Sequence, residues 1–286
     1  MPGMPELPEI EALRELLVDR FVGQRPSAVS VHQFALVKTV DPPLDALVGR
    51  PLADARRRGK HLLLDFDAEL TLAIHLGIGG RIVIADGSRK PPRSVSLAIA
   101  MDDSSALRVV ELGSKKRSSV HLLRRDDVQG HLAHLGIDAL SPELTVDRLG
   151  SLLSAERSQL KRFLDDQRRV AGIGNAYSDE ILWEARLPPL RLTTTLEEAE
   201  VQRLYTAIAA VLGDAIARAR EDNYLLVARG DERGTFQVHR KSGQPCPRCG
   251  ERIASIHFAE NSLQYCPMCQ VEGRQYADRR LSRLLR

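Results

Sequence analysis

Residues 246–269 read CPRCGERIASIHFAENSLQYCPMC, so two Cys-x-x-Cys pairs are separated by sixteen residues. Each pair, Cys246 with Cys249 and Cys266 with Cys269, forms a chelating turn, and a short hairpin between the turns brings four thiolates to one tetrahedral ion. Two disulfides or four free thiols would not explain this paired spacing. We therefore predict one structural zinc ion that all four cysteines bind, with no open position for water.

The residues between the two pairs predict a small rigid finger, with two strands and a tip over Ile256 to Tyr265, of a size that suits insertion into a groove. The finger lies in a basic part of the chain, because residues 240–286 hold nine Lys or Arg and four Asp or Glu. Further basic clusters lie at 56–60, 115–117 and 161–162 with 168–169. One such cluster is more often a solvated face, but four together favour a polyanion such as nucleic acid.

Length and composition limit the possible classes of protein. The chain has 286 residues, 43% hydrophobic and 28% charged, with a net charge of +3, which is typical of a globular protein of about two domains. Four cysteines are too few for a disulfide scaffold. No apolar run approaches the roughly 18 residues of a membrane span, and the start lacks the pattern of a signal peptide. We expect a soluble, cytoplasmic protein that does not bind membranes.

The first 130 residues predict one helix followed by an antiparallel sandwich or barrel. Ile10, Leu13, Leu16, Leu17 and Phe21 recur at helical spacing, and the helix should end near Gly23. After it, short apolar runs alternate with Gly, Pro, Asp and Ser turns about every ten residues. The predicted strands are 28–31, 61–66, 70–75, 81–84, 95–101, 107–112 and 120–123.

The rest of the chain reads as helical, and we expect an all-α second domain with a cysteine-bearing tail. The predicted helices are 149–153, 158–164, 175–185 and 196–220. Thr195 should cap the last of these helices, because Glu198 follows it at capping-box spacing.

The segment Gly172-Ile-Gly-Asn175 joins two of these helices, with Asn175 where the second begins. Backbone N–H groups and the positive end of the helix dipole favour an anion here, and glycines let a phosphate approach closely. A dinucleotide motif is a poor match, because the third glycine and the preceding strand are missing. A helix pair that needs glycine only for tight packing stays open.

The N-terminal segment Pro5-Glu6-Leu7-Pro8-Glu9 is ambiguous from its residues alone. An N-terminal proline has a secondary amine that can act as a nucleophile, and Glu6 beside it could move protons. The alternative is a proline-rich cap on the first helix, which the pattern by itself favours.

These features together resemble the formamidopyrimidine-DNA glycosylase and endonuclease VIII family along nearly the whole chain. The resemblance rests on the Pro-Glu-Leu-Pro-Glu start, the Arg-Arg-Gly-Lys turn at 57–60, His75-Leu-Gly77, the segment from Gly172 through Asp179-Glu180-Ile-Leu182, and the paired cysteines. Their order and separations are highly specific.

The resemblance implies an α+β multidomain protein that binds damaged DNA. An N-terminal helix and antiparallel β-sandwich would form a catalytic domain over residues 1–130. A helix-two-turns-helix domain over 131–235 and a zinc finger with a basic tail over 236–286 would follow. The implied activity is that of a bifunctional DNA glycosylase and abasic-site lyase of base excision repair. We expect a monomer acting on duplex DNA, with single strands as a possible substrate.

The resemblance also implies roles for individual residues. Pro5 matches the nucleophile that forms an iminium with the opened sugar, and Glu6 matches the general acid and base. Lys60 matches a lysine that contacts phosphate beside the lesion, and Asn175 matches an asparagine that holds another phosphate. Such contacts suit extrusion of a nucleotide from the duplex. Glu9 belongs to the same start motif and could orient the proline.

Several positions depart from the family pattern. Three residues precede Met4, and a chain processed to Pro2 would lock Pro5 in an amide; we expect that the functional chain begins at Pro5. Ile78 replaces the methionine of the wedge that fills the void, and residues 113–118, with Lys115, Lys116 and Arg117, carry no aromatic. Asn261 replaces the finger arginine. The segment 229–237 is short where enzymes acting on 8-oxoguanine carry a capping loop.

These departures favour oxidised pyrimidines, ring-opened purines or abasic sites as substrates. They also keep a second hypothesis open, in which a catalytically weak or inactive relative binds damaged or branched DNA. A zinc-ribbon protein acting on RNA or protein partners would leave Pro5, Lys60 and Asn175 without a joint purpose. We expect the single tryptophan, Trp183, to lie in the core, and His61 and His75 to be structural.

Overall fold

The computed structural model describes residues 5–112, 117–221, 236–258 and 262–276, and its chain divides into two compact units. The first unit comprises residues 1–134 and 215–232, and the second comprises residues 135–214 and 233–286. No helix in the described ranges is long and apolar enough to span a bilayer.

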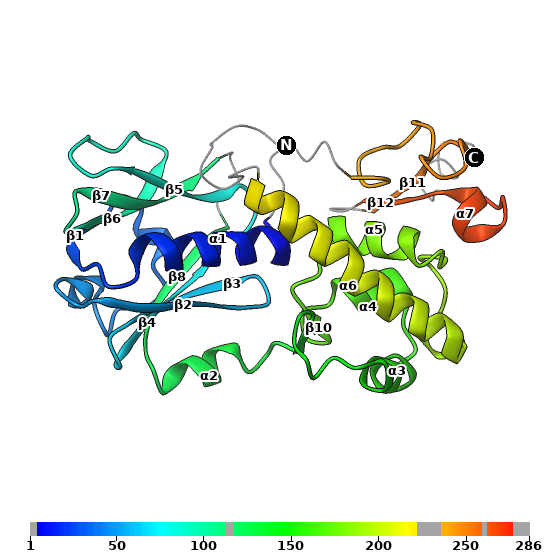
Figure 1. Ribbon diagram of the computed structural model, residues 1–286, viewed down its shortest axis with the longest axis horizontal. Coiled ribbons are helices and arrows are strands. Elements are labelled where there is room, and N and C mark those ends of the chain that lie inside the picture. The colour runs from blue at the N-terminus through cyan, green and yellow to red at the C-terminus, as the bar shows by residue number, and fades with distance from the viewer. Residues whose placement is uncertain (1–4, 113–116, 222–235, 259–261, 277–286) are drawn as a thin grey trace. The chain divides into compact units, whose positions relative to one another are not determined.

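The first unit is a sandwich of two four-stranded antiparallel sheets with helix α1, Leu7–Phe21, packed on it (Figure 1). One sheet has the order β1-β6-β7-β5, and the other has the order β2-β3-β4-β8. The strands are β1 Pro26–Val31, β2 Leu52–Arg58, β3 His61–Phe66, β4 Leu70–His75, β5 Gly80–Asp86, β6 Val95–Met101, β7 Ser105–Glu111 and β8 Ser119–Arg124. Two short helices, η1 Phe34–Leu36 and η2 Leu44–Leu47, lie between β1 and β2, and helix α2 Asp127–Leu132 follows β8. The predicted helix and antiparallel sandwich are confirmed.

One apolar cluster fills the sandwich and continues onto α1. Ile10, Leu13 and Leu17 are at most 2% exposed and pack in the same cluster as Leu64 of β3 and Leu97 of β6. Full burial of one such side chain contributes about 1.5–3 kcal/mol, so the helical spacing of these residues decides which face of α1 turns inward. The helix ends at Phe21 and the chain turns at Gly23, which has a positive φ.

Strand β2 is absent from the sequence prediction, which treated residues 56–60 as a basic cluster. Two of its arginines make ion pairs inside the unit: Arg56 Nη2 donates to Asp65 Oδ1 on β3 at 2.9 Å, and Arg57 Nε donates to Glu11 Oε2 on α1 at 2.8 Å. The strand therefore uses charged residues where an apolar alternation would have revealed it.

The second unit combines helices with two small β pairs. Its helices are α3 Val146–Ser154, α4 Leu160–Asp165, α5 Asn175–Glu184, η3 Thr193–Thr195, α6 Glu198–Glu221, which continues into the first unit, and α7 Pro267–Val271. Strands β11 Ala254–His257 and β12 Ser262–Tyr265 form the predicted finger hairpin. The expectation that this part, the finger aside, is all-α is wrong, because β9 Ile137–Asp138 and β10 Val170–Ala171 pair in parallel.

The predicted cap of the long helix is also wrong. Thr195 ends the short helix η3, and its hydroxyl donates to the carbonyl of Leu192 at 2.8 Å. Helix α6 begins at Glu198, and the backbone N–H of Glu197 donates to Glu200 Oε2 at 2.9 Å. The same capping chemistry occurs two residues later, because three threonines in succession favour a separate turn.

A glycine beside the β9–β10 pair provides a test of this packing. A Cβ on Gly136 would lie 2.3 Å from the carbonyl oxygen of Arg169 and 2.4 Å from that of Arg168, and backbone cannot move aside as a flexible side chain can. We expect Gly136→Ala to destabilise the protein by about 1–3 kcal/mol.

The matched control is Gly130→Ala in α2, where an added Cβ meets no atom within 4 Å. This change should be neutral or stabilising by up to about 1 kcal/mol, because alanine is the better helix former. Thermal unfolding followed by circular dichroism measures both variants. Equal melting temperatures for the two would contradict the close approach at Gly136.

Candidate nucleic-acid interface and metal centre

Pro5 and Glu6 lie at the start of α1, where Glu6 is the N-cap residue. The Glu6 side chain accepts the backbone N–H of Glu9, and Glu9 Oε2 accepts the backbone N–H of Glu6 at 2.8 Å. Pro5 is buried, and both glutamates are 3% exposed. This reciprocal capping box confirms the interpretation of the segment as a helix cap. It also fixes a carboxyl group on the residue that follows Pro5.

Lys60 lies in the two-residue turn between β2 and β3. The turn needs a residue with positive φ, which Gly59 supplies at +57°. Arg57 Nη1 donates to the Gly59 carbonyl at 2.8 Å and so ties the turn to the strand before it. Lys60 is 6% exposed, and within the described residues no salt bridge joins it to a carboxylate. None of the described carboxylates of the first unit therefore neutralises its charge.

Five of the eight histidines gather next to this turn, in a group that we call the histidine cluster: His61, His75, His121, His131 and His134. His61 and His75 face each other across β3 and β4, with ring centroids 4.8 Å apart. The sequence prediction named these two as structural but missed the other three: His121 in β8, His131 in α2 and His134 just after α2.

Four rings of the histidine cluster have lowered pKa values and are neutral at pH 7. Burial, and then repulsion from the neighbouring imidazoles, lowers the pKa of His61 to about 3. Burial, and then the charge of Lys60, lowers the pKa of His75 to about 4. Burial also lowers the pKa of His121 and of His131. These rings therefore pack without adding charge beside Lys60.

The two segments predicted to form the wedge lie together. A Cβ on Gly77, whose φ is +54°, would lie 2.4 Å from the carbonyl oxygen of Arg117, and Ser118 Oγ donates to the Leu76 carbonyl at 2.7 Å. Ile78 is half-buried and Arg117 is exposed. Lys115 and Lys116 lie outside the described residues, and so does Asn261 of the finger.

Asn175 is the first residue of α5, which has Gly174 as its N-cap. The chain reaches this point through Gly172, whose φ of +110° is accessible only to glycine at low cost. Lys161 Nζ lies beneath the turn and donates to the Asn175 carbonyl at 2.5 Å and to Ser178 Oγ at 2.8 Å. The half-buried Asn175 therefore lies at the positive end of a helix that is firmly held.

Several residues counted in the basic clusters make internal ion pairs instead. Lys161 is 9% exposed and pairs with Asp179 Oδ1 at 2.8 Å. Arg168 pairs with Asp166 at 2.8 Å, and Arg169 pairs with Glu156. The interpretation of 161–169 as an exposed basic cluster is therefore wrong for Lys161. The acidic partner of Lys161, Asp179, lies on the next helix, α5, and is buried.

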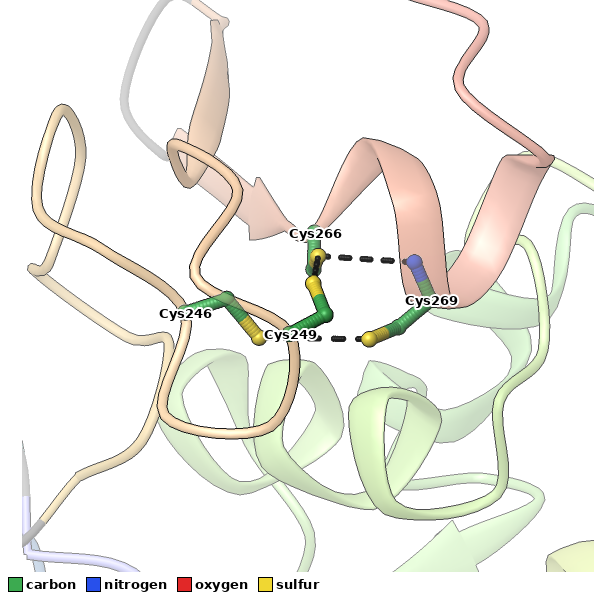
Figure 2. A group of neighbouring side chains, drawn as sticks. All are labelled: Cys246, Cys249, Cys266 and Cys269. Carbon is green, nitrogen blue, oxygen red and sulfur yellow. Dashed lines mark hydrogen bonds between the residues drawn. The ribbon is translucent and has the colours of Figure 1, made fainter.

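The four cysteines converge as predicted, and their Sγ atoms all lie within 4.8 Å of one another (Figure 2). Cys246 and Cys249 come from one loop, and Cys266 and Cys269 come from the start of α7. The Sγ atoms are 3.9 Å apart between Cys246 and Cys269, and 3.4 Å apart between Cys249 and Cys266. Zn–S bonds of about 2.3 Å place tetrahedral ligands about 3.8 Å apart. This donor set fits a structural zinc ion.

The cysteine thiols differ in acidity before metal binding. Burial raises the pKa of the Cys246 thiol, but hydrogen bonds from the Arg248 backbone, the Trp183 indole and the Cys249 backbone outweigh it and bring the pKa to about 7. Burial raises the pKa of Cys269 to about 11. Cys246 therefore loses its proton more readily than Cys269.

A buried carboxylate connects α5 to the segment that enters the finger. Glu180 accepts the backbone N–H groups of Gln237, Val238 and His239 at 2.8–2.9 Å. His239 Nδ1 lies 2.8 Å from Asp179 Oδ2. Burial raises the pKa of Glu180 despite these three donors. The sequence prediction quoted Asp179-Glu180 in a motif but assigned neither residue a role.

Three family models match the chain. The formamidopyrimidine-DNA glycosylase N-terminal domain matches residues 4–114, the formamidopyrimidine-DNA glycosylase H2TH domain matches 135–223, and the zinc finger found in FPG and IleRS matches 243–271. Among curated relatives, the formamidopyrimidine-DNA glycosylase of Chloroflexus aurantiacus is 34% identical, with 95% of this chain and 99% of the relative covered. That of Mycolicibacterium smegmatis is 33% identical, with 95% and 99% covered.

Solved structures of Lactococcus lactis FPG have the same fold. An FPG variant bound to DNA containing Fapy-dG is 28% identical with a TM-score of 0.84, covering 93% of this chain and 100% of that one. The FPG complex with DNA containing an abasic site gives 27% identity, a TM-score of 0.84 and the same coverage. The similarity therefore includes both units and the finger.

The histidine cluster predicts a pH dependence of stability. Because the folded pKa values of His61 and His75 are lowered, the unfolded chain binds protons that the folded chain does not as pH falls below about 6.5. Stability should fall from about pH 6.5 toward pH 4 and be unaffected by these groups above that range. Each histidine contributes a slope of up to about 1.4 kcal/mol per pH unit.

Urea unfolding between about pH 5 and pH 7 measures this slope. His75→Gln should flatten it relative to the parent, whereas His32→Gln, at an exposed position, should leave it unchanged. An equal slope in the parent and in His75→Gln would show that the cluster does not carry the effect.

Proposed function

The chain belongs to the formamidopyrimidine-DNA glycosylase family, and from this premise we propose that Pro5 is the nucleophile with which it excises damaged bases. The enzyme is a DNA glycosylase of base excision repair with abasic-site lyase activity, it acts on damaged DNA, and a structural zinc ion holds its finger. We place it on bacterial DNA, in the cytoplasm and at the nucleoid, because its curated relatives are bacterial.

The capping box at the start of α1 is the observation that carries the proposal. It fixes the carboxyl of Glu6, the residue that follows Pro5, in a buried setting, and the match to the N-terminal domain begins one residue before Pro5. With residues 1–4 removed, Pro5 has a secondary amine with a lone pair. Glu9 then has a defined part, since its carboxylate fixes the backbone of Glu6.

The reaction uses this amine twice. The Pro5 nitrogen attacks the anomeric carbon of the damaged nucleotide, the base leaves, and Glu6 protonates the sugar ring oxygen as the ring opens to an iminium. The iminium acidifies the neighbouring carbon, and loss of that proton expels the 3′ phosphate. Water then hydrolyses the iminium and regenerates the amine. One nucleophile thus serves base excision and strand cleavage.

Lys60 and Asn175 would hold the backbone of the damaged strand. Lys60 offers a cation without an ion-pair partner among the described residues, and Asn175 lies at the N-terminus of a ten-residue helix. Such contacts position DNA and carry no sequence information. They suit an enzyme that recognises a lesion by flipping it out of the stack.

The wedge and the length of the 229–237 segment, of which residues 229–235 lie outside the described residues, bear on the choice of lesion. Ile78 follows Gly77, which packs against Arg117, and by their resemblance these positions match the methionine and the aromatic loop that fill the void left by a flipped base. We propose a preference for ring-opened purines, oxidised pyrimidines and abasic sites. Structures of the Lactococcus lactis relative include complexes with DNA containing Fapy-dG and an oxidized pyrimidine.

Borohydride trapping tests the nucleophile. Protein shown by mass spectrometry to begin at Pro5 should form a covalent adduct with an abasic-site oligonucleotide, because borohydride reduces the iminium to a stable amine. Protein that retains residues 1–4 should form none, because an amide nitrogen cannot attack. The two forms should bind a stable abasic analogue with similar affinity. No adduct from protein that begins at Pro5 would favour a damage-binding relative without catalysis.

Glu6→Gln separates proton transfer from the helix cap, because a glutamine oxygen can still accept the Glu9 N–H. Base excision should slow by about 100-fold or more, with circular dichroism unchanged. Glu15→Gln, at an exposed ion pair on the same helix, is the control and should keep the parent rate.

A lesion panel tests the substrate proposal. Rates of excision of ring-opened guanine, an oxidised pyrimidine and 8-oxoguanine are compared in duplex and in single-stranded DNA. We expect the first two in duplex DNA to be excised at least about tenfold faster than 8-oxoguanine, which corresponds to about 1.4 kcal/mol in the barrier. Faster excision of 8-oxoguanine would contradict the proposed preference.

A further inference from the structure

Trp183, the only tryptophan of the chain, contacts a zinc ligand directly. It lies near the end of α5 and is 8% exposed, as expected for a core residue. Its indole Nε1, however, donates to Cys246 Sγ at 3.4 Å. The indole shares a buried apolar cluster with Val238, Ile253 and Cys266. Water is therefore largely excluded from this N–H···S hydrogen bond, which strengthens it.

Arg248, which lies within the first Cys-x-x-Cys turn, stacks over the Trp183 indole ring. Its guanidinium carbon lies 3.9 Å from the centroid of the Trp183 ring. Arg248 Nη1 donates to the Trp183 carbonyl at 2.8 Å, and Nη2 donates to Glu184 Oε2 at 2.7 Å. The chelating turn thus binds the end of α5 through stacking and two hydrogen bonds.

Four thiolates around one divalent ion leave a net negative charge on the centre. A donor aimed at one sulfur stabilises that charge and orients the ligand, as the outer contacts of metal-binding histidines do. We propose that Trp183 is a positioning residue of the zinc centre: its indole N–H holds the Cys246 thiolate in its ligating orientation and withdraws charge from it, so that zinc is bound more tightly.

The surrounding contacts explain why the indole stays in place. Glu180, one turn earlier on α5, accepts three backbone N–H groups of the segment that leads to the finger. Arg248 donates a hydrogen bond to the backbone carbonyl of Trp183 itself. These contacts restrain the indole, so little conformational freedom is lost when its hydrogen bond to Cys246 forms.

Trp183→Phe removes the N–H donor and keeps an aromatic ring beneath Arg248. The full chain should then bind zinc about tenfold or more weakly in competition with a chromophoric chelator, the typical effect of losing an outer contact of a metal ligand. The matched control is Tyr265→Phe, which removes the hydroxyl that accepts the Tyr276 N–H at 2.8 Å but does not contact a cysteine. Equal weakening in both variants would overturn the proposal.

Cobalt substitution gives a signature that a merely structural role would not produce. The sulfur-to-cobalt charge-transfer band should move to lower energy in Trp183→Phe, because a sulfur without its donor gives up an electron more easily. It should stay in place in Tyr265→Phe. An unmoved band in a folded Trp183→Phe protein would also overturn the proposal.

The unmodified chain provides a measurement that does not depend on the variant's folding. With nitrogen-labelled tryptophan, the single Trp183 gives one indole N–H resonance. Loading with a spin-active cadmium isotope should produce scalar coupling between cadmium and this proton through the N–H···S bond. A resolved indole signal without that coupling would show that the hydrogen bond to the ligand is absent.

Discussion

A carboxylate buried in apolar surroundings must have hydrogen-bond partners, and Glu180 meets this requirement with three consecutive backbone N–H groups. Because those groups belong to residues 237–239, the start of the finger can follow α5 along only one path. Asp179 makes the equivalent contacts with Lys161 and His239. The same ten-residue helix begins with Asn175, the residue proposed to hold a phosphate, and ends beside the metal centre at Trp183 and Glu184.

In the first unit, ion pairs distinguish the basic residues that stabilise the fold from Lys60, the basic residue that is proposed to contact DNA. Arg56 and Arg57 are neutralised by Asp65 and Glu11, and the lowered pKa values of His61 and His75 keep these two rings uncharged at pH 7. Lys60, in the turn that follows β2, has no acidic partner among the described residues. A count of basic residues cannot make this distinction, because it depends on which carboxylates the fold brings near.

Short-range patterns predicted most of the fold and the metal site. The cysteine spacing determined the zinc ligands, the helical spacing of Ile10, Leu13 and Leu17 gave the buried face of α1, and the glycines before Asn175 marked a helix start. The misses depend on contacts between distant segments. Strand β2 is hidden by ion pairs with β3 and α1, the histidine cluster arises from strand register, and Lys161 is buried against Asp179. Thr195 shows that a correct capping pattern can be displaced by two residues when a neighbouring turn competes.

The ion pair between Arg57 and Glu11 connects the two segments of the first unit that carry Lys60 and Glu6. It joins the strand that leads to Lys60 to the helix that begins behind Glu6, and both partners belong to the first unit. The relative position of Lys60 and Glu6 is thus determined within the first unit and does not depend on the finger. Loss of zinc would accordingly unfold the finger while Lys60 and Glu6 kept their relative positions in the first unit. Substitutions in the finger can therefore accumulate without changing the geometry of these two residues.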